Sequence, residues 1–103
     1  MLRISIALLG LLALAAPATA STDAAWKASA RAGRAACIAA AHLVRPTVSA
    51  AVGFSDRVGY DAMLVRGTYP QRFMKGARGT MLCLYDRRSR HAEVAEAKGW
   101  SAR

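Results

Sequence analysis

The residues that could perform chemistry in this 103-residue chain are few and widely spaced. The cysteines are Cys37 and Cys83, and the histidines are His42 and His91. A nucleophilic thiol needs a lowered pKa, a nearby base or a CxxC pair, and a zinc site needs three or four converging ligands. The chain has no CxxC, HxH, HExxH or CxxCH motif. We therefore predict no metal site and no attached haem. A free thiol with His42 or His91 as its base is the rival to a disulfide.

Carboxylates, serines and glycine-rich loops are also poorly placed for catalysis. The chain has only 6 acidic residues, and Glu93 and Glu96 lie near several arginines. Neighbouring arginines lower the pKa of a carboxyl group, whereas a general acid needs a raised pKa. We interpret these carboxylates as members of surface ion pairs. The GxSxG motif and the Walker phosphate loop are both absent. We therefore predict that the protein is not an enzyme, has no catalytic residues and binds no cofactor.

The first 20 residues have the three parts of a secretory signal peptide. Arg3 supplies a positive charge, residues 4–16 form an apolar run, and Ala18-Thr19-Ala20 has the small-x-small pattern of a cleavage site. We predict cleavage after Ala20, which leaves residues 21–103 as one small domain in the periplasm or outside the cell. The apolar run is shorter than the roughly 20 residues of a spanning helix, so we expect no transmembrane anchor in the mature chain.

Export would place the two cysteines in an oxidising compartment, where a disulfide is the usual outcome. With two cysteines, only one intramolecular bond can form, between Cys37 and Cys83. The bond would close a long loop, and the chain-entropy model gives it roughly 3–4 kcal/mol of stabilisation. A domain of this size has a thin core, so we expect the disulfide to contribute a large share of its stability.

Basic residues are the most prominent feature that remains. The chain has 15 Lys and Arg residues against 6 Asp and Glu, for a formal net charge of +9. Such an excess favours anionic partners, and arginine makes paired contacts with phosphate and carboxylate groups. A genome that prefers arginine codons, or a need for solubility, would explain the same composition. The candidate anion-binding residues are Arg72, Lys75 and Arg78 in an expected loop and Arg87, Arg88 and Arg90 in an expected turn.

Residues 21–45 have the pattern of a helix. Ser21, Thr22 and Asp23 offer N-cap oxygens, and Pro46 disfavours helical geometry at Arg45 and so marks the expected end. Apolar and small residues recur at three- and four-residue steps and share one face. That face comprises Trp26, Ala30, Gly33, Cys37, Ala40 and Val44.

The second half of the chain has the alternation typical of strands. We predict strands over residues 58–68, 79–86 and 91–97, with a weaker edge strand over residues 47–52 and a loop over residues 69–79. The strand over residues 79–86 is apolar on both faces and should be central. A short helix is the alternative for residues 91–98. The fold class is therefore α+β, with one N-terminal helix on a three- or four-stranded, mostly antiparallel sheet and one disulfide between them.

The C-terminal block GTMLCLYDRR at residues 79–88, followed by AEVAEA at residues 92–97, resembles small exported bacterial proteins that have no assigned activity. The stretch GTYPQ at residues 67–71 adds to the likeness, which covers about residues 67–100. The resemblance implies a periplasmic protein of helix-plus-sheet shape. It implies no activity and no ligand.

Together these patterns predict an exported binding module that is not an enzyme. After export, anionic envelope polymers, lipid headgroups and acidic proteins are closer than any genome, so we expect one of these as the partner and no specific nucleic acid. One alternative is an accessory subunit of an envelope assembly, which predicts an exposed apolar patch or a free sheet edge. Another is a small enzyme inhibitor that uses the loop over residues 69–79.

Overall fold

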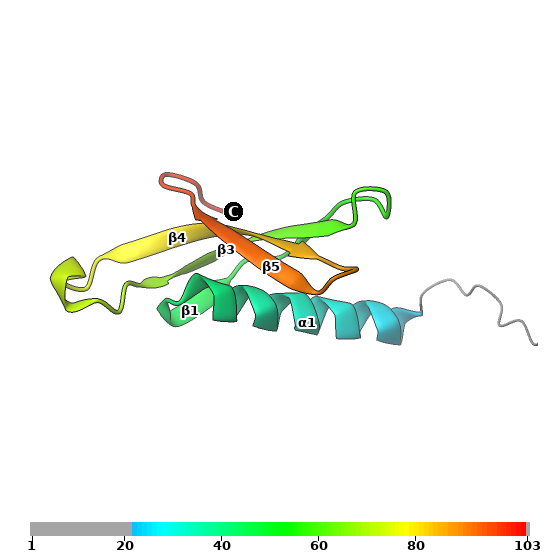
Figure 1. Ribbon diagram of the computed structural model, residues 1–103, viewed down its shortest axis with the longest axis horizontal. Coiled ribbons are helices and arrows are strands. Elements are labelled where there is room, and N and C mark those ends of the chain that lie inside the picture. Colours follow the sequence, from blue (N-terminus) through cyan, green and yellow to red (C-terminus); the bar gives the residue numbers. More distant parts are fainter. Residues whose placement is uncertain (1–21, 103) are drawn as a thin grey trace, which may run out of the picture.

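The computed structural model describes residues 22–102, which form one helix and a five-stranded antiparallel sheet (Figure 1). The helix lies against one face of the sheet. The predicted α+β class is confirmed, with more strands than the three or four expected. The predicted signal peptide, residues 1–20, lies outside the described residues. In chain order the elements are α1 (Asp23–Ala41), β1 (Val44–Val48), β2 (Val52–Gly53), β3 (Tyr60–Thr68), the 3-10 helix η1 (Arg72–Met74), β4 (Arg78–Asp86) and β5 (His91–Glu96).

The helix α1 begins with a capped first turn. The Oγ1 atom of Thr22 accepts a hydrogen bond of 3.0 Å from the N–H of Ala25, and Asp23 places a carboxylate at the positive end of the helix dipole. Buried residues appear on α1 only from Gly33 onward, and Trp26 is 51% exposed. Trp26 shares the predicted apolar face but lies outside its buried part, because the first turns of α1 extend beyond β5 in Figure 1.

The helix also ends earlier than the sequence predicts. Its last residue is Ala41, and His42 takes the left-handed conformation, with a φ angle of 52°, that stops the helix. The predicted end at Arg45 is wrong because the chain from Val44 onward pairs with β3, and strand pairing outweighs local helix propensity there. Pro46 is tolerated because β1 is an edge strand. Among residues 22–102, no helix is long and apolar enough to cross a membrane.

The sheet has the strand order β1-β3-β4-β5, and β2 pairs with β3 along the same edge as β1. The central position predicted for β4 is confirmed, and its register places Cys83 between Met63 of β3 and Val94 of β5. The segment for which a helix was the alternative is the strand β5. The prediction of one edge strand over residues 47–52 is wrong, because this edge of the sheet consists of two short strands, β1 and β2. Between them the N–H of Leu64 donates to the Ser49 hydroxyl and not to a backbone oxygen.

The core lies between α1 and the facing side chains of β3 and β4. Cys37, Val65 and Cys83 are completely buried there. The predicted disulfide is confirmed: it joins α1 to β4, with the Cα atoms of Cys37 and Cys83 5.9 Å apart. The ring of Tyr85 packs on the backbone of Gly33, where a Cβ atom would approach the ring Cδ2 to 2.9 Å. The helix therefore approaches β4 closely at two points, one covalent and one through packing.

Candidate functional site

The two predicted basic clusters lie at opposite ends of β4. Arg78 is the first residue of this strand, and Asp86, just before the second cluster, is its last. At about 3.3 Å per residue, a nine-residue strand separates its ends by roughly 25–30 Å. In Figure 1 the β3–β4 loop lies beyond the C-terminal end of α1, and the β4–β5 turn lies nearer the N-terminal half of α1. The six candidate residues therefore do not form one site.

In the β4–β5 turn, Arg87 has a structural role. Its Nη1 atom donates hydrogen bonds to the backbone oxygen of Tyr60, at 3.0 Å, and to the carboxylate of Asp61. Its Nη2 atom donates to the backbone oxygen of Phe54, at 2.8 Å, and to the carboxylate of Asp56, at 3.3 Å. The Arg87 side chain is only 13% exposed. Its guanidinium joins the turn to β3 and to the segment before it, and it is not available to an outside anion.

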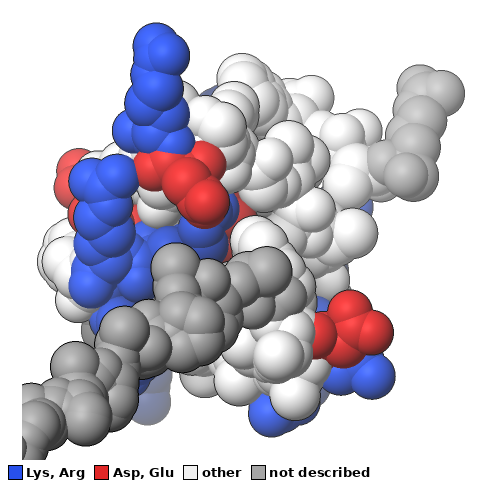
Figure 2. Space-filling view, turned by 90° about the vertical axis from the view of Figure 1, so that its right-hand side faces the viewer, with Lys and Arg blue, Asp and Glu red and all other residues white. Residues whose placement is uncertain are grey.

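The neighbouring side chains of this turn are also partly engaged. Arg88 donates from Nη2 to the backbone oxygen of Asp56, at 2.8 Å. The Oδ1 atom of Asp86 accepts the backbone N–H of Arg88 at 2.9 Å, and this hydrogen bond, followed by contacts from Ser89, lowers the pKa of Asp86. Figure 2 views this end of the molecule and shows carboxylates among the basic side chains. Of the three arginines in this turn, only Arg90 keeps an exposed guanidinium for which no hydrogen bond or salt bridge is found within residues 22–102.

The β3–β4 hairpin differs because it carries positive charge without carboxylates. No Asp or Glu occurs between Asp61 and Asp86. Within residues 22–102, no salt bridge involves the basic residues of this span, and all of them are exposed. These residues are Arg66, Arg72, Lys75 and Arg78. The hairpin therefore carries positive charge with no acidic residue near it in the chain, and the carboxylate nearest its base comes from β5, where Glu96 lines the same hollow as Arg78.

The loop of this hairpin, residues 69–77, is held by its own hydrogen bonds. The N–H of Tyr69 donates to the oxygen of Ala77 at 2.9 Å, which closes the loop at its base. Lys75 and Gly76 have φ angles of 52° and 74°, and the left-handed backbone reverses the chain after η1. The ring of Tyr69 covers Gly79, where a Cβ atom would come within 2.6 Å of it. The loop is thus an ordered structure that presents Arg72 and Lys75 in fixed places.

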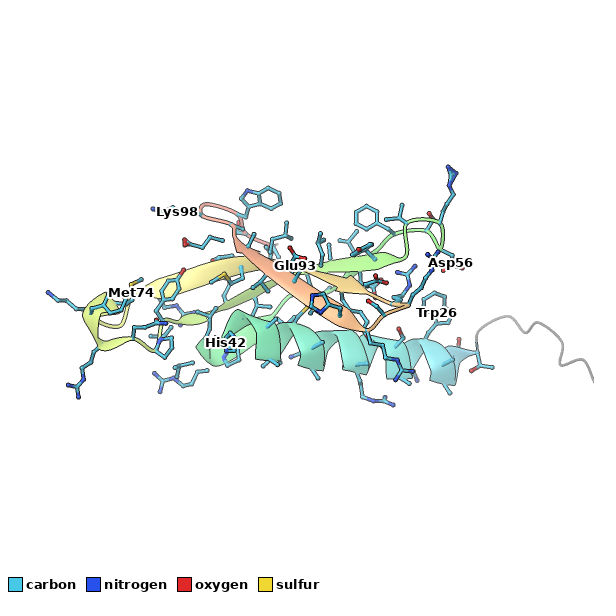
Figure 3. The ribbon with its side chains drawn as sticks, in the orientation of Figure 1. Trp26, His42, Asp56, Met74, Glu93 and Lys98 are labelled. Carbon is cyan, nitrogen blue, oxygen red and sulfur yellow. A yellow bond between two sulfur atoms is a disulfide. The ribbon has the colours of Figure 1, made fainter. Side chains whose placement is uncertain are left out.

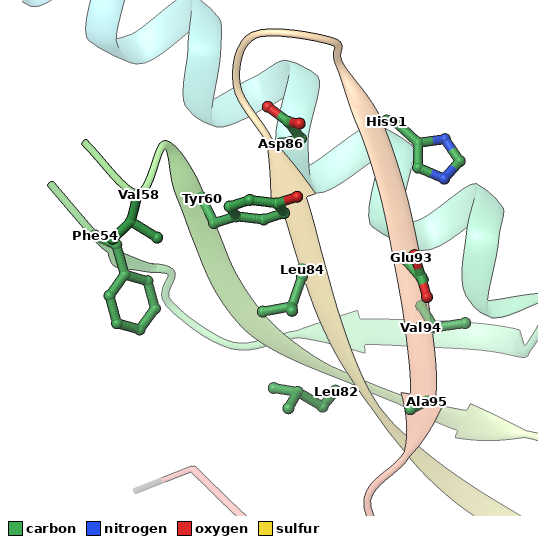
Figure 4. A pocket seen from close by; sticks show the side chains of 10 residues that line it. All are labelled: Phe54, Val58, Tyr60, Leu82, Leu84, Asp86, His91, Glu93, Val94 and Ala95. Carbon is green, nitrogen blue, oxygen red and sulfur yellow. The ribbon is translucent and has the colours of Figure 1, made fainter. Parts of the chain in front are cut away.

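A second candidate surface is the face of the sheet turned away from α1, which we name the open face. Leu82 and Leu84 form its floor, and Phe54 and Val58 form one wall of a groove of about 450 Å³ (Figure 4). The exposed fractions of Leu84, Phe54 and Val58 are 39%, 47% and 52%. Within residues 22–102 no helix covers this face. The sequence contained the information that predicts this exposed face, because β4 is apolar on both faces and a single helix covers only one of them.

Polar side chains gather at one end of this groove. Tyr60, Asp86 and His91 lie near the β4–β5 turn, and Glu93 lies along β5 (Figure 4). Both cysteines belong to the disulfide, so a nucleophilic thiol with His42 or His91 as its base is wrong. Among residues 22–102, no three His, Cys, Asp or Glu side chains lie close enough together to hold a metal ion. Within residues 22–102, the groove on the open face and the hairpin loop therefore remain as candidate sites.

Comparison with protein-family models, with curated proteins and with solved structures finds no match to this chain. Function is therefore inferred from the geometry of the hairpin loop and the open face. The hairpin holds Arg72 and Lys75 in its loop and Arg78 at the start of β4, all exposed, whereas the turn binds Arg87 internally and leaves Arg90 by itself.

Proposed function

We propose that this protein is an exported, non-enzymatic module that binds an anionic component of the cell envelope through the hairpin loop. The observation that carries the proposal is the exposed cluster Arg72, Lys75 and Arg78 in a span that contains no carboxylate. Guanidinium groups bind phosphate with two parallel hydrogen bonds, and an ordered loop loses little conformational entropy on binding. An acidic protein is the alternative partner of the same surface.

Export is the second part of the proposal, and the disulfide supports it. Disulfides persist in oxidising compartments and are rare in the cytosol, and Cys37–Cys83 is buried in the centre of the core. The signal-peptide pattern of residues 1–20 points in the same direction. The compartment is then the periplasm or the cell exterior, where lipid headgroups and anionic polymers are abundant.

Two triple variants with the same change in charge test the proposal. The first, Arg72→Gln, Lys75→Gln and Arg78→Gln, removes the hairpin cluster, and the second, Lys27→Gln, Arg31→Gln and Arg34→Gln, removes three exposed charges from α1. Binding to lipopolysaccharide and to soluble polyphosphate is measured by calorimetry from low to physiological salt.

At about 0.1 M salt the hairpin triple should lose more than tenfold in affinity and the α1 triple only a few-fold, because Coulomb interactions between exposed charges fall off within a Debye length of about 10 Å at that ionic strength. Binding should weaken as salt rises. Equal losses in the two triples would mean that net charge alone attracts the anion, and the proposal would be wrong.

The open face favours a second candidate function, an accessory subunit that docks on a partner protein. Its exposed side chains Phe54, Val58 and Leu84 form the apolar patch that this function requires. A photo-crosslinking residue at Phe54, with one at the exposed Trp26 as control, tests it in cells. A discrete crosslinked product at Phe54 and none at Trp26 would support a docking face, and equal products at both would count against it.

A further inference from the structure

Phe73 at the tip of the hairpin loop is exposed without a structural reason. Its exposed fraction, 76%, is the highest among the large hydrophobic residues described in this structure. The next residue, Met74, is half-buried, and it lines a hollow at the base of the loop together with Tyr69. The loop therefore already has apolar side chains that turn inward, and Phe73 contributes nothing to that packing.

The backbone of the loop holds Phe73 in its outward position. Within η1, the N–H of Met74 donates to the oxygen of Gln71 at 2.9 Å, and the N–H of Lys75 donates to the oxygen of Arg72 at 3.0 Å. The N–H of Ala77 donates to the oxygen of Met74 at 3.0 Å. A tip fixed in this way presents an aromatic ring without ordering a flexible segment first, which lowers the entropic cost of binding.

Two basic residues flank Phe73 in the sequence. Arg72 precedes Phe73 directly, Lys75 follows two residues later, and both are exposed. In Figure 3 the end of the molecule that carries Met74 extends past His42, which marks the end of α1. Because the loop projects from the end of the sheet, a flat surface can contact the tip without contacting the body of the domain.

We propose that the hairpin loop docks end-on to a bilayer of anionic phospholipid, with Phe73 inserted between the headgroups and Arg72, Lys75 and Arg78 on the lipid phosphates. This inference rests on the proposed anion-binding function and names its partner. A soluble polyanion offers phosphate but no apolar layer, so it leaves the ring of Phe73 in water. A membrane interface offers both, since aromatic rings settle at the headgroup level and cations attract the anionic surface.

The two contributions predict separable losses of affinity. Moving a Phe side chain from water into an apolar environment is favourable enough that its loss should weaken vesicle binding about tenfold. Each basic residue near an anionic membrane surface strengthens binding about fivefold. Either contribution by itself gives only weak, reversible attachment, and stable anchoring of peripheral proteins takes two signals.

The experiment uses the oxidised protein without residues 1–20 and vesicles of phosphatidylcholine with or without 30% phosphatidylglycerol, a composition chosen as roughly that of an anionic membrane leaflet. Partitioning is measured by sedimentation for the wild type, for Phe73→Ala and for Phe54→Ala, whose ring is also exposed but lies on the open face. Soluble polyphosphate binding is measured for the same three proteins. Both positions are exposed, so neither substitution removes a buried side chain, and thermal melts of the variants check that the fold is kept.

We expect wild type and Phe54→Ala to bind phosphatidylglycerol vesicles equally and neutral vesicles weakly. Phe73→Ala should bind the anionic vesicles about tenfold more weakly and polyphosphate as the wild type does. In a protein with Trp26→Phe and Trp100→Phe, the emission of Phe73→Trp should shift to the blue on vesicle binding, because the indole enters a less polar layer.

Two outcomes would overturn the inference and separate it from the proposed function. If Phe73→Ala binds anionic vesicles as the wild type does, or if Phe54→Ala loses as much, insertion of Phe73 is wrong. In that case the proposed anion-binding function stands as long as the hairpin charge triple still loses polyphosphate binding. If the wild type binds neither vesicles nor polyphosphate, the proposed function fails, and the inference fails with it.

Discussion

Replacement of Arg87 tests whether the turn cluster is structural or binds ligand. The Arg87 guanidinium bonds two carboxylates and two backbone oxygens, and its side chain and that of Asp61 are each 13% exposed. Arg87→Ala leaves the Asp61 carboxylate without a cation in a nearly buried place. Removing one partner of a buried pair costs about 3–5 kcal/mol, and the remaining exposure places the expected cost near the lower end, about 3 kcal/mol.

Arg87→Lys is the more conservative change. A lysine keeps the charge near Asp61 but lacks the planar fork that reaches several acceptors at once. Losing one or two hydrogen bonds to backbone oxygen should destabilise the protein by about 1–2 kcal/mol. Small domains have net stabilities of about 5 kcal/mol, so Arg87→Ala should remove more than half of that value.

Urea unfolding of the oxidised protein, followed by circular dichroism, measures these changes in the free energy of unfolding. The matched control is Arg90→Lys, because the Arg90 side chain lies in the same turn and makes no hydrogen bond or salt bridge with the described residues, and its change should stay within about 0.5 kcal/mol. Thermal midpoints should fall by roughly 12 °C or more for Arg87→Ala. Equal stability of Arg87→Lys and Arg90→Lys would refute the reasoning, and so would a tenfold loss of vesicle binding in Arg87→Lys.

Three further predictions concern the core and the turn. Replacing Cys37 and Cys83 together by Ala should lower the free energy of unfolding by roughly 3–4 kcal/mol, since the bond closes a separation of 46 residues; urea unfolding of the variant checks this, and a loss below about 1 kcal/mol would contradict it. Gly33→Ala should destabilise by about 1–2 kcal/mol although Ala is the better helix former, because the added Cβ meets the buried ring of Tyr85 at 2.9 Å; a stabilised variant in the same assay would show that helix propensity wins. Asp86, whose pKa is lowered in the folded state, stabilises the fold above its unfolded pKa of about 4, and this contribution is lost as pH falls through the lower folded pKa. Asp86→Asn should therefore make stability less dependent on pH below about 4, and an unchanged slope in pH-dependent urea titrations would argue against that role.

The elements with strong local patterns were predicted well, and the failures came where tertiary pairing decided. The alternation of Met81, Cys83 and Tyr85 against Leu82 and Leu84 predicts a central strand, and β4 is that strand. The single disulfide followed from the count of cysteines. The end of α1 did not follow, because no local feature before Pro46 shows that the chain leaves the helix at His42 to pair with β3.

For the candidate site, too, the sequence showed some features and the folded structure decided the others. The basic residues were visible in the sequence, and so was the loop that carries Arg72 and Lys75, whereas Arg78, predicted in that loop, is the first residue of β4 because it pairs with Thr68 of β3. Two clusters of similar composition nevertheless have different environments. The carboxylates that bond Arg87 come from residues 26 and 31 positions earlier in the chain, and only the folded sheet brings them to the turn.

The sequence by itself determined the residue types, the periodicities and the one pairing open to two cysteines, because these depend on side chains close in the chain or on simple counting. Tertiary structure alone decided which arginines are free, which face of β4 is covered and which apolar residue is presented to solvent. Those properties depend on packing between distant segments, such as the approach of α1 to Gly33 and Tyr85 and the outward position of Phe73. Burial and charge pairing depend on neighbours in space, and the sequence indicates them only within a single helix or strand, whose periodicity places residues on one face.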